Sequence, residues 1–331
     1  MFAFGLALVV LALAVHLYRQ YWFSRSLPRV RGVESGGETF VVGATAITVL
    51  RPDADPVRTI VCMPGFLEDS SYFLDLYAGR GYELVLVNNA DYHSPFSVDG
   101  AKALEWQPNP FPVGTIEHDA FYVARAVRDL ASARDVVIHG HSRGGAVALE
   151  TGRQFASVFT RPDREVSVLL EAAVVPQGAP AGGFPNPVVA AFMTYFIPIV
   201  FGFLRNVSRD VLVRMPMMKP VNELKIRRLQ TLFVHPKRYS TCVTNLRDIW
   251  HWQQSRGYDA YRACPPGRLL VGERDDVLDT ETMRTSGEAG ARENPGMRVV
   301  QTKGTNHFIS LENPDAVYGA LAELAAVKPS A

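Results

Sequence analysis

The stretch Gly140-His141-Ser142-Arg143-Gly144 decides the fold of this chain. An apolar run, residues 135–139, precedes it, and a run of small residues, 145–149, follows it. A strand, a tight turn and a helix in this order hold a serine in a strained elbow with its hydroxyl exposed. Glycine suits positions 140 and 144, because a Cβ there would collide where the strand and helix backbones approach. The stretch therefore predicts that Ser142 is a nucleophile; the alternative is an ordinary glycine-rich turn between a strand and a helix.

Strand and helix signals alternate on both sides of this elbow. Strands are predicted at residues 39–42, 46–50, 58–63, 83–88, 135–139, 165–170, 268–271 and 297–301. Helices are predicted at residues 70–78, 115–130 and 311–325. Such alternation is typical of an α/β fold, in which helices cover both faces of a mostly parallel sheet. A chain of 331 residues is long enough for one such domain with an insertion.

The interval 175–265 breaks this rhythm. It contains several prolines, an apolar run at 188–204 and a basic, methionine-containing segment at 214–228. An interval of this length between two core strands is too long for an ordinary loop. We therefore expect a helical cap at 175–265, inserted into a core formed by 38–174 and 266–331. The alternative is a set of ordinary core helices.

The N-terminus is strongly apolar. Residues 1–15 have no polar side chain, and the first formal charge is Arg19. A helix of about 18 residues would be about 27 Å long, close to the bilayer hydrocarbon thickness of about 30 Å. We predict a membrane-anchor helix at 1–22 and a linker at 23–37. Because the basic residues lie only on its C-terminal side, the catalytic domain is expected on the cytoplasmic side.

Two other interpretations of this segment remain open. Ala12-Leu13-Ala14 resembles a signal-peptidase site, so a cleaved signal peptide would export the protein, although no basic region precedes the apolar run. A hydrophobic helix buried against the protein is the other interpretation.

Charge and cysteine content exclude several classes of partner. The net charge is +1, so nothing indicates nucleic-acid binding. Cys62, Cys242 and Cys264 are scattered and form no CxxC pair, which argues against a disulfide framework and a cysteine zinc site. We expect no metal and no organic cofactor. The sequence does not indicate an oligomeric state.

A serine nucleophile needs a general base, and the base needs a carboxylate to orient it. Asp275 follows an apolar strand in Gly272-Glu273-Arg274-Asp275, and His307 follows the last strand. Both therefore lie beyond the carboxyl ends of strands, where ligands meet open α/β sheets. We predict a triad of Ser142, Asp275 and His307, with Asp276 and Glu171 as alternative acids.

Backbone N–H groups usually stabilise the oxyanion of acyl transfer. We assign this role to the N–H groups of Arg143, after the nucleophile, and of Phe66, in the loop after the strand at 58–63. For the Arg143 side chain two interpretations are open. It forms an ion pair on a helix, or it contacts a substrate carboxylate or phosphate.

From about residue 39 to the C-terminus the chain resembles the α/β-hydrolase superfamily, and in particular serine esterases and lipases with an inserted cap. The matching motifs are Gly140-His141-Ser142-Arg143-Gly144-Gly145, Gly272-Glu273-Arg274-Asp275 and Asn306-His307-Phe308. Two loops depart from the family pattern: Pro64-Gly65 replaces its usual His-Gly pair, and Asp91-Tyr92-His93-Ser94-Pro95 replaces a glycine-rich loop.

The resemblance implies a serine hydrolase that cleaves a carboxylic ester through an acyl-enzyme. The anchor and the apolar cap favour a lipophilic ester at the membrane surface, with Phe192, Tyr195 and Phe196 as candidate substrate-binding residues. The same triad also serves acyltransferases and thioesterases, which are the alternative function. A catalytically inactive binding scaffold is a further alternative, although all three triad residues are present.

Overall fold

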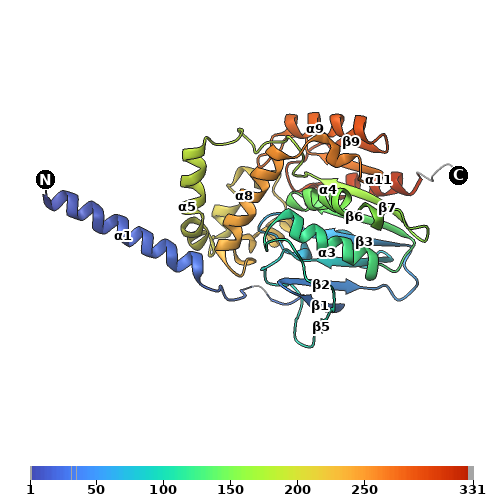
Figure 1. The fold of residues 1–331 in the computed structure, drawn as a ribbon, viewed down its shortest axis with the longest axis horizontal. Helices are drawn as coiled ribbons and strands as arrows, with labels where there is room; N and C mark the ends of the chain where they lie inside the picture. The colour runs from blue at the N-terminus through green and yellow to red at the C-terminus, as the bar shows by residue number, and fades with distance from the viewer. Residues whose placement is uncertain (1, 31, 35, 327–331) are drawn as a thin grey trace.

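A nine-stranded sheet forms the centre of the molecule (Figure 1). The computed structural model describes residues 2–30, 32–34 and 36–326; Arg31 and Ser35 of the predicted linker lie outside the described residues. The strand order is β5-β1-β2-β4-β3-β6-β7-β8-β9. The strands are β1 (Glu38–Val42), β2 (Thr45–Leu50), β3 (Arg58–Met63), β4 (Tyr82–Val87), β5 (Lys102–Ala103), β6 (Asp135–His141), β7 (Glu165–Glu171), β8 (Gly267–Val271) and β9 (Met297–Gln301).

Only β2 pairs antiparallel with its neighbours β1 and β4, and the other pairs within the described sheet are parallel. The predicted α/β fold with a mostly parallel sheet is therefore confirmed. In the parallel part, Met63 of β3 lies opposite Gly140 of β6, and His141 of β6 lies opposite Glu171 of β7. The carboxyl ends of β3, β6 and β7 thus meet at one edge of the sheet.

Helices cover both faces of the sheet (Figure 1). Thr115 caps the start of α3 by accepting a hydrogen bond from the His118 N–H, which satisfies a backbone donor that the helix leaves unpaired. The helices are α1 (Phe2–Ser24), α2 (Leu74–Tyr77), α3 (Ile116–Asp129), α4 (Arg143–Phe155), α5 (Pro187–Leu204), α6 (Arg209–Leu212), α7 (Glu223–Leu229), α8 (Tyr239–Ser255), α9 (Thr280–Glu293), α10 (Ile309–Glu312) and α11 (Pro314–Ala326).

Two helix predictions need correction. The helix expected at 70–78 is a 3₁₀ turn, Ser70–Phe73, followed by the short α2. Helix α9 lies in a segment for which no helix was predicted. Its sequence contains two glycines, Gly287 and Gly290, which usually indicate an interrupted helix.

Two hydrophobic cores lie on opposite faces of the sheet because successive strand side chains point to opposite sides. Val61 and Met63 of β3 belong to the core shared with α3 and α4. Ile60 and Cys62 of the same strand belong to the core shared with α2 and α11. Both faces of the central strands are therefore buried, as is usual for a parallel sheet.

The interval 175–265 contains α5 to α8. Part of it is integrated with the sheet core, because Trp252 of α8 is buried there and its indole Nε1 donates to Glu150 of α4 at 3.1 Å. The α5 end packs instead on the other core, through Ile197 and Phe201. The predicted cap therefore shares its C-terminal end with the body, and its assignment as a separate insertion remains a prediction.

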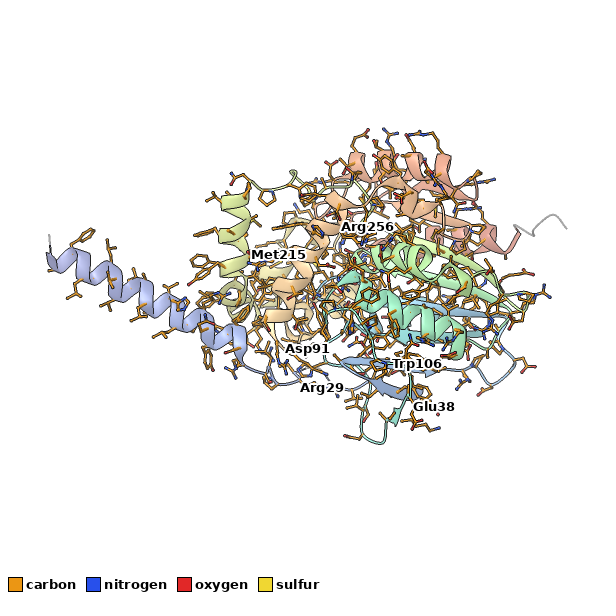
Figure 2. The ribbon with its side chains drawn as sticks, in the orientation of Figure 1. Arg29, Glu38, Asp91, Trp106, Met215 and Arg256 are labelled. Atoms are coloured by element: carbon orange, nitrogen blue, oxygen red, sulfur yellow. The ribbon has the colours of Figure 1, made fainter. Side chains whose placement is uncertain are left out.

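Helix α1 projects away from the body, and only its last turns contact α5 and α8 (Figure 1). Residues 27–30, which we call the strap, then lie against the body. Leu27 is buried, and its N–H donates to the Lys237 carbonyl at 2.7 Å. Arg29 donates to the Ser94 carbonyl at 2.5 Å, in the loop that carries Asp91 (Figure 2).

Two described helices are long and apolar enough to cross a membrane, namely Ala3–Ser24 within α1 and Pro187–Leu204, which is α5. Core helices of soluble proteins and signal sequences meet the same criteria of length and composition. None of the span in α1 is buried in the protein, whereas part of α5 is buried.

Candidate active site

Ser142 lies at the turn between β6 and α4, and its backbone is strained. Its φ of 51° and ψ of −117° place a non-glycine residue at positive φ. The Ser142 N–H donates to the Glu171 carbonyl, and its carbonyl accepts from Val174, both at 2.9 Å. These bonds to β7 and the following loop hold the strained turn, which is the elbow that the pentapeptide predicts. The residue is 6% exposed.

The two glycines of the pentapeptide are required by close backbone approach. A Cβ on Gly140 would collide with the carbonyl of Gly144, and a Cβ on Gly144 would collide with the carbonyl of Met63. Each contact is with backbone, which cannot rotate out of the way. Alanine at position 140 would therefore push the start of α4 away from the end of β6, and alanine at position 144 would displace the elbow from β3.

Asp275 and His307 meet at the same edge of the sheet. His307 Nδ1 lies 2.8 Å from Asp275 Oδ2. The other carboxylate oxygen, Oδ1, accepts the N–H groups of Val277 at 2.8 Å and Leu278 at 2.9 Å. Burial raises the pKa of Asp275, but the charge and hydrogen bond of His307 outweigh it, so this pKa lies below its usual value. The carboxylate is thus ionised and held in one orientation toward the imidazole.

Asp276, an alternative acid, points elsewhere. Its carboxylate accepts from the Arg274 guanidinium at 2.8 Å and from the Asn306 amide at 2.7 Å. No hydrogen bond of the described residues joins it to His307. The structure therefore pairs His307 with Asp275 rather than with its neighbour.

Glu171, the other alternative acid, is buried beneath the site. It accepts from His139 Nε2 at 3.0 Å, from the Tyr72 hydroxyl at 2.8 Å and from the Ser310 hydroxyl at 2.5 Å. Burial raises the pKa of Glu171, but the hydrogen bonds from His139 and Ser310 and the charges of His139 and His141 lower it to about 2. Because Ser310 lies three residues after His307, Glu171 anchors the His307 loop without contacting the imidazole.

The loop after β3 lies directly beside the nucleophile. A Cβ on Gly65 would come within 2.9 Å of the Ser142 Cβ. Within the described residues, the backbone N–H groups of Phe66 and Arg143 donate no hydrogen bond. Both N–H groups are therefore available as donors near Ser142, and an oxyanion site requires such donors.

The side chain of Arg143 is fully buried. Its guanidinium donates to Asp119 at 2.6 Å, to Asn89 at 2.9 Å and to the Gly114 carbonyl at 3.3 Å. Burial raises the pKa of Asp119, but the charges and hydrogen bonds of Arg143 and His118 together lower that pKa below its usual value. Of the two interpretations from the sequence, the structure places this side chain in an ion pair, with a residue of α3.

A buried pair that the sequence does not indicate, Glu68 and His141, joins three loops of the site. His141 Nδ1 lies 2.8 Å from Glu68 Oε2, and His141 Nε2 lies 2.9 Å from the His307 carbonyl. The same Glu68 oxygen accepts the Gly65 N–H at 2.8 Å. The pair therefore ties the loop after β3, the elbow and the His307 loop together.

His141 must carry both ring protons, because each ring nitrogen faces an acceptor. Burial alone would lower its pKa, but the Glu68 carboxylate outweighs burial and raises the pKa of His141 to about 9. Position 141 lies inside the pentapeptide and Glu68 lies four residues after Pro64. Nothing in the sequence indicates that these two residues pair across the site.

The three candidate substrate-binding residues lie on α5, away from the triad. The rings of Phe192 and Phe196 pack on each other at 4.4 Å, and Tyr195 contacts α1. No hydrogen bond or ring contact of the described residues brings them to Ser142 or His307. Another residue of α5, Phe201, packs on Phe66 with ring centroids 6.3 Å apart.

Metal-binding groups are not clustered in this part of the molecule. Among the residues that the structure describes, no group of three or more His, Cys, Asp or Glu side chains could hold a metal ion. The three cysteines are free and buried.

Comparison with known proteins agrees with this geometry. The model of the alpha/beta hydrolase family matches residues 60–320. No curated protein matches the sequence.

Several solved structures share the fold. An esterase from Thermogutta terrifontis is 18% identical, with 90% of this chain and 98% of that chain covered and a TM-score of 0.59. An esterase from Exiguobacterium antarcticum is 16% identical, with coverage of 88% and 99% and a TM-score of 0.58. The enol-lactonase from Burkholderia xenovorans LB400 is also 16% identical, with coverage of 87% and 99% and a TM-score of 0.58. With the family match over most of the chain, the conclusion is that this protein belongs to the alpha/beta hydrolase family.

Proposed function

We propose that this chain is a serine hydrolase that cleaves the carboxylic ester of a lipophilic substrate through an acyl-enzyme. The observation that carries the proposal is the 2.8 Å contact between His307 Nδ1 and Asp275 Oδ2. It lies next to the elbow, since His141, the residue before Ser142, contacts the His307 carbonyl. A serine at an elbow beside an oriented histidine is the arrangement that acyl transfer requires.

In the first half of the reaction, Ser142 Oγ attacks the ester carbonyl carbon. His307 Nε2 takes the proton from Oγ, while Asp275 holds Nδ1–H and stabilises the imidazolium. The N–H groups of Phe66 and Arg143 stabilise the negative carbonyl oxygen of the tetrahedral intermediate. The bond to the alcohol oxygen then breaks, and that oxygen receives the proton from His307.

In the second half, water attacks the carbonyl carbon of the acyl-enzyme and gives its proton to His307. The bond to Ser142 Oγ breaks, Oγ regains the proton, and the carboxylic acid leaves. Each half begins and ends with neutral His307, so the cycle needs no group beyond these residues and water.

The lipophilic substrate follows from the proposed site of action, which is a membrane surface. Helix α1 has 23 residues, so it is about 34 Å long and can cross the bilayer hydrocarbon. Arg19 and Arg25 at its C-terminal end favour a body on the cytoplasmic side.

The first test is labelling with a fluorophosphonate probe, which reacts only with an activated serine. Wild-type protein should be labelled and Ser142→Ala should not, while Ser157→Ala, at an exposed serine, should be labelled like wild type. An ester series of increasing acyl length then tests the substrate class, and activity should rise with length. Absence of labelling in folded wild-type protein contradicts the proposal and favours an inactive scaffold.

The anchor is tested separately. Membranes from expressing cells are washed with alkaline carbonate, and the intact mass of the retained protein is measured. Retention with residues 1–22 present supports the anchor. A mass lacking these residues, or release into the wash, contradicts it and favours a cleaved signal peptide or a helix buried against the protein.

A further inference from the structure

Helix α5 has a buried face and an exposed face, and both are apolar. The buried face carries Thr194, Ile197 and Phe201. The exposed residues repeat every three or four positions on the other side of the helix and are 43–79% exposed; they are Val188, Val189, Phe192, Met193, Val200 and Phe203. The water-facing side of a surface helix normally carries charged and polar residues. A long exposed apolar face of this kind indicates a contact with a partner or a membrane.

We call the exposed side of α5, which carries the residues from Val188 to Phe203 named above, the outer face. It adjoins α1 at a group of aromatic and basic residues. His16 of α1 hydrogen-bonds the Tyr195 hydroxyl at 2.8 Å, and Arg19 donates to the Tyr195 carbonyl at 3.1 Å. The rings of Tyr18 and Phe203 lie 6.0 Å apart. Aromatic rings and arginines gather at the headgroup level of membrane proteins. If α1 spans the membrane, α5 therefore lies at the level of the headgroups.

The directions of the two helices fix how α5 meets the bilayer. Helix α1 runs outward from the body, and α5 crosses that direction along the edge of the body from which α1 emerges (Figure 1). If α1 crosses the bilayer, α5 lies along its surface. Although α5 is long enough to span a membrane, this orientation makes it an in-plane helix, with its apolar side in the boundary between headgroups and acyl chains.

We propose that the outer face of α5 is a second membrane contact, which lies flat on the bilayer that α1 spans. The proposal rests on the membrane location given above and adds the surface with which the catalytic body docks. A lipid bilayer fits this face better than a second copy of the chain, because the face is continuous with α1.

The docked orientation brings the bilayer close to the reaction site. Phe201, on the inner face of α5, packs on Phe66, whose N–H is the proposed oxyanion donor. One helix, about 10 Å across, therefore separates the lipid from the loop beside Ser142. A lipid ester has a short path from its bilayer to the nucleophile.

Single cysteines with an environment-sensitive fluorophore test this docking. The native Cys62, Cys242 and Cys264 are buried, so the label reaches only the introduced residue. Val188→Cys and Phe203→Cys place labels at opposite ends of α5, about 22 Å apart along its axis. Val57→Cys, at a residue 72% exposed in the loop between β2 and β3, is the matched control on the body.

The full chain is placed in nanodiscs, one molecule in each, made of phosphatidylcholine and phosphatidylglycerol with spin-labelled lipids. We expect both α5 labels to be quenched to the same shallow depth and the label at position 57 to remain unquenched. Unequal depths at 188 and 203 would show that α5 spans the bilayer and would overturn the proposal. If the α5 labels emit like the label at position 57, the proposal is overturned. It is also overturned if the α5 labels are shielded from water in concentrated detergent solution but are not quenched by lipid, because a second copy of the chain would then cover the face.

An activity measurement separates this proposal from the proposed reaction. Val188→Asp and Phe203→Asp should keep wild-type labelling by the fluorophosphonate probe but hydrolyse a long-chain ester in vesicles at least about tenfold more slowly, the effect of about 1.4 kcal/mol. Val57→Asp should change neither reading. Unchanged vesicle hydrolysis in the α5 variants argues against the docking face but not against the proposed reaction. Absence of probe labelling in wild type argues against the reaction but not against the docking face, because the quenching result does not depend on catalysis.

Discussion

The edge of the sheet around Ser142 and the outer face of α5 differ in opposite ways from an ordinary protein. The first buries charged side chains, and the second exposes large apolar ones. At the catalytic edge, charged residues such as Glu68, His141 and Glu171 are buried, and each has hydrogen-bond partners. On α5, large apolar residues face outward. Both arrangements cost free energy in a protein that only needs to fold in water. Such departures tend to mark function, and we propose chemistry for one region and membrane contact for the other.

The two regions also differ in what supports them. The buried charges are held by partners within the chain, so removing one partner should damage folding or catalysis. The apolar residues on the outer side of α5 stay 43–79% exposed, although Phe203 lies beside Tyr18 of α1, so the loss of one such as Val188 should leave the isolated protein intact. The following experiments test this difference.

The largest effect is expected at the triad carboxylate. Asp275→Asn should lower kcat by about 10⁴-fold, because the imidazole loses the partner that orients it and stabilises its charge. Asp276→Asn, whose wild-type partners are Arg274 and Asn306, should keep kcat near the wild-type value. Steady-state hydrolysis of a soluble ester measures both. Equal losses in the two variants would refute the assignment of the acid.

The next effect concerns the buried pair beneath the elbow. Glu68→Gln leaves the His141 charge without its carboxylate, which should lower the free energy of unfolding by about 3–5 kcal/mol. Glu223→Gln is the control, because that side chain is 80% exposed. Urea unfolding in detergent micelles gives both values. If the two variants lose the same small amount, the pair does not stabilise the site.

The pH dependence of stability should reveal the same pair. The pKa of His141 is about 9 in the folded protein and about 6.5 in the unfolded chain. Its contribution, about 3 kcal/mol, is therefore complete below about pH 6.5 and lost as the pH rises through about 9. The free energy of unfolding of the wild-type protein should therefore decrease between about pH 6.5 and pH 9. The His141→Gln variant should lack this part of the decrease. An identical slope in both proteins would contradict the assignment.

The smallest effect is expected on α5. Val188→Ser should change the free energy of unfolding in detergent by less than about 0.5 kcal/mol, as is usual for exposed positions. Leu86→Ala, at a buried position of β4, should cost about 2–5 kcal/mol and serves as the reference. A large loss at Val188 would show that the outer face has a packing partner within the chain.

Much of the sheet was predictable, because its strands are apolar runs between turn signals. The elbow was predictable from five residues, since only glycine fits where Gly140 and Gly144 meet backbone. Helix α9 was missed for a related reason. A Cβ on Gly287 would collide with Leu269 and one on Gly290 with Tyr261, so these glycines serve tertiary packing although they weaken the helix.

Other parts of the site depend on contacts between distant segments. Glu68 and His141 are 73 positions apart, and no periodicity connects them. The sequence of α5 is apolar on every side, so it could not show which face is buried; the packing of Ile197 and Phe201 on the body decides this. The candidate residues Phe192, Tyr195 and Phe196 were chosen from composition alone, whereas the packing brings Phe201 of the same helix against Phe66 in the loop after β3.

The strap has a consequence for where the enzyme works. Leu27 and Arg29 join the body to the end of α1 through hydrogen bonds to Lys237 and Ser94, so little slack separates the two parts. A long flexible leash would let a tethered enzyme reach neighbouring vesicles. Under the proposed function, a body strapped to its stalk acts in cis, on esters dissolved in its own bilayer, so turnover is expected to follow the mole fraction of substrate in that bilayer rather than the bulk concentration.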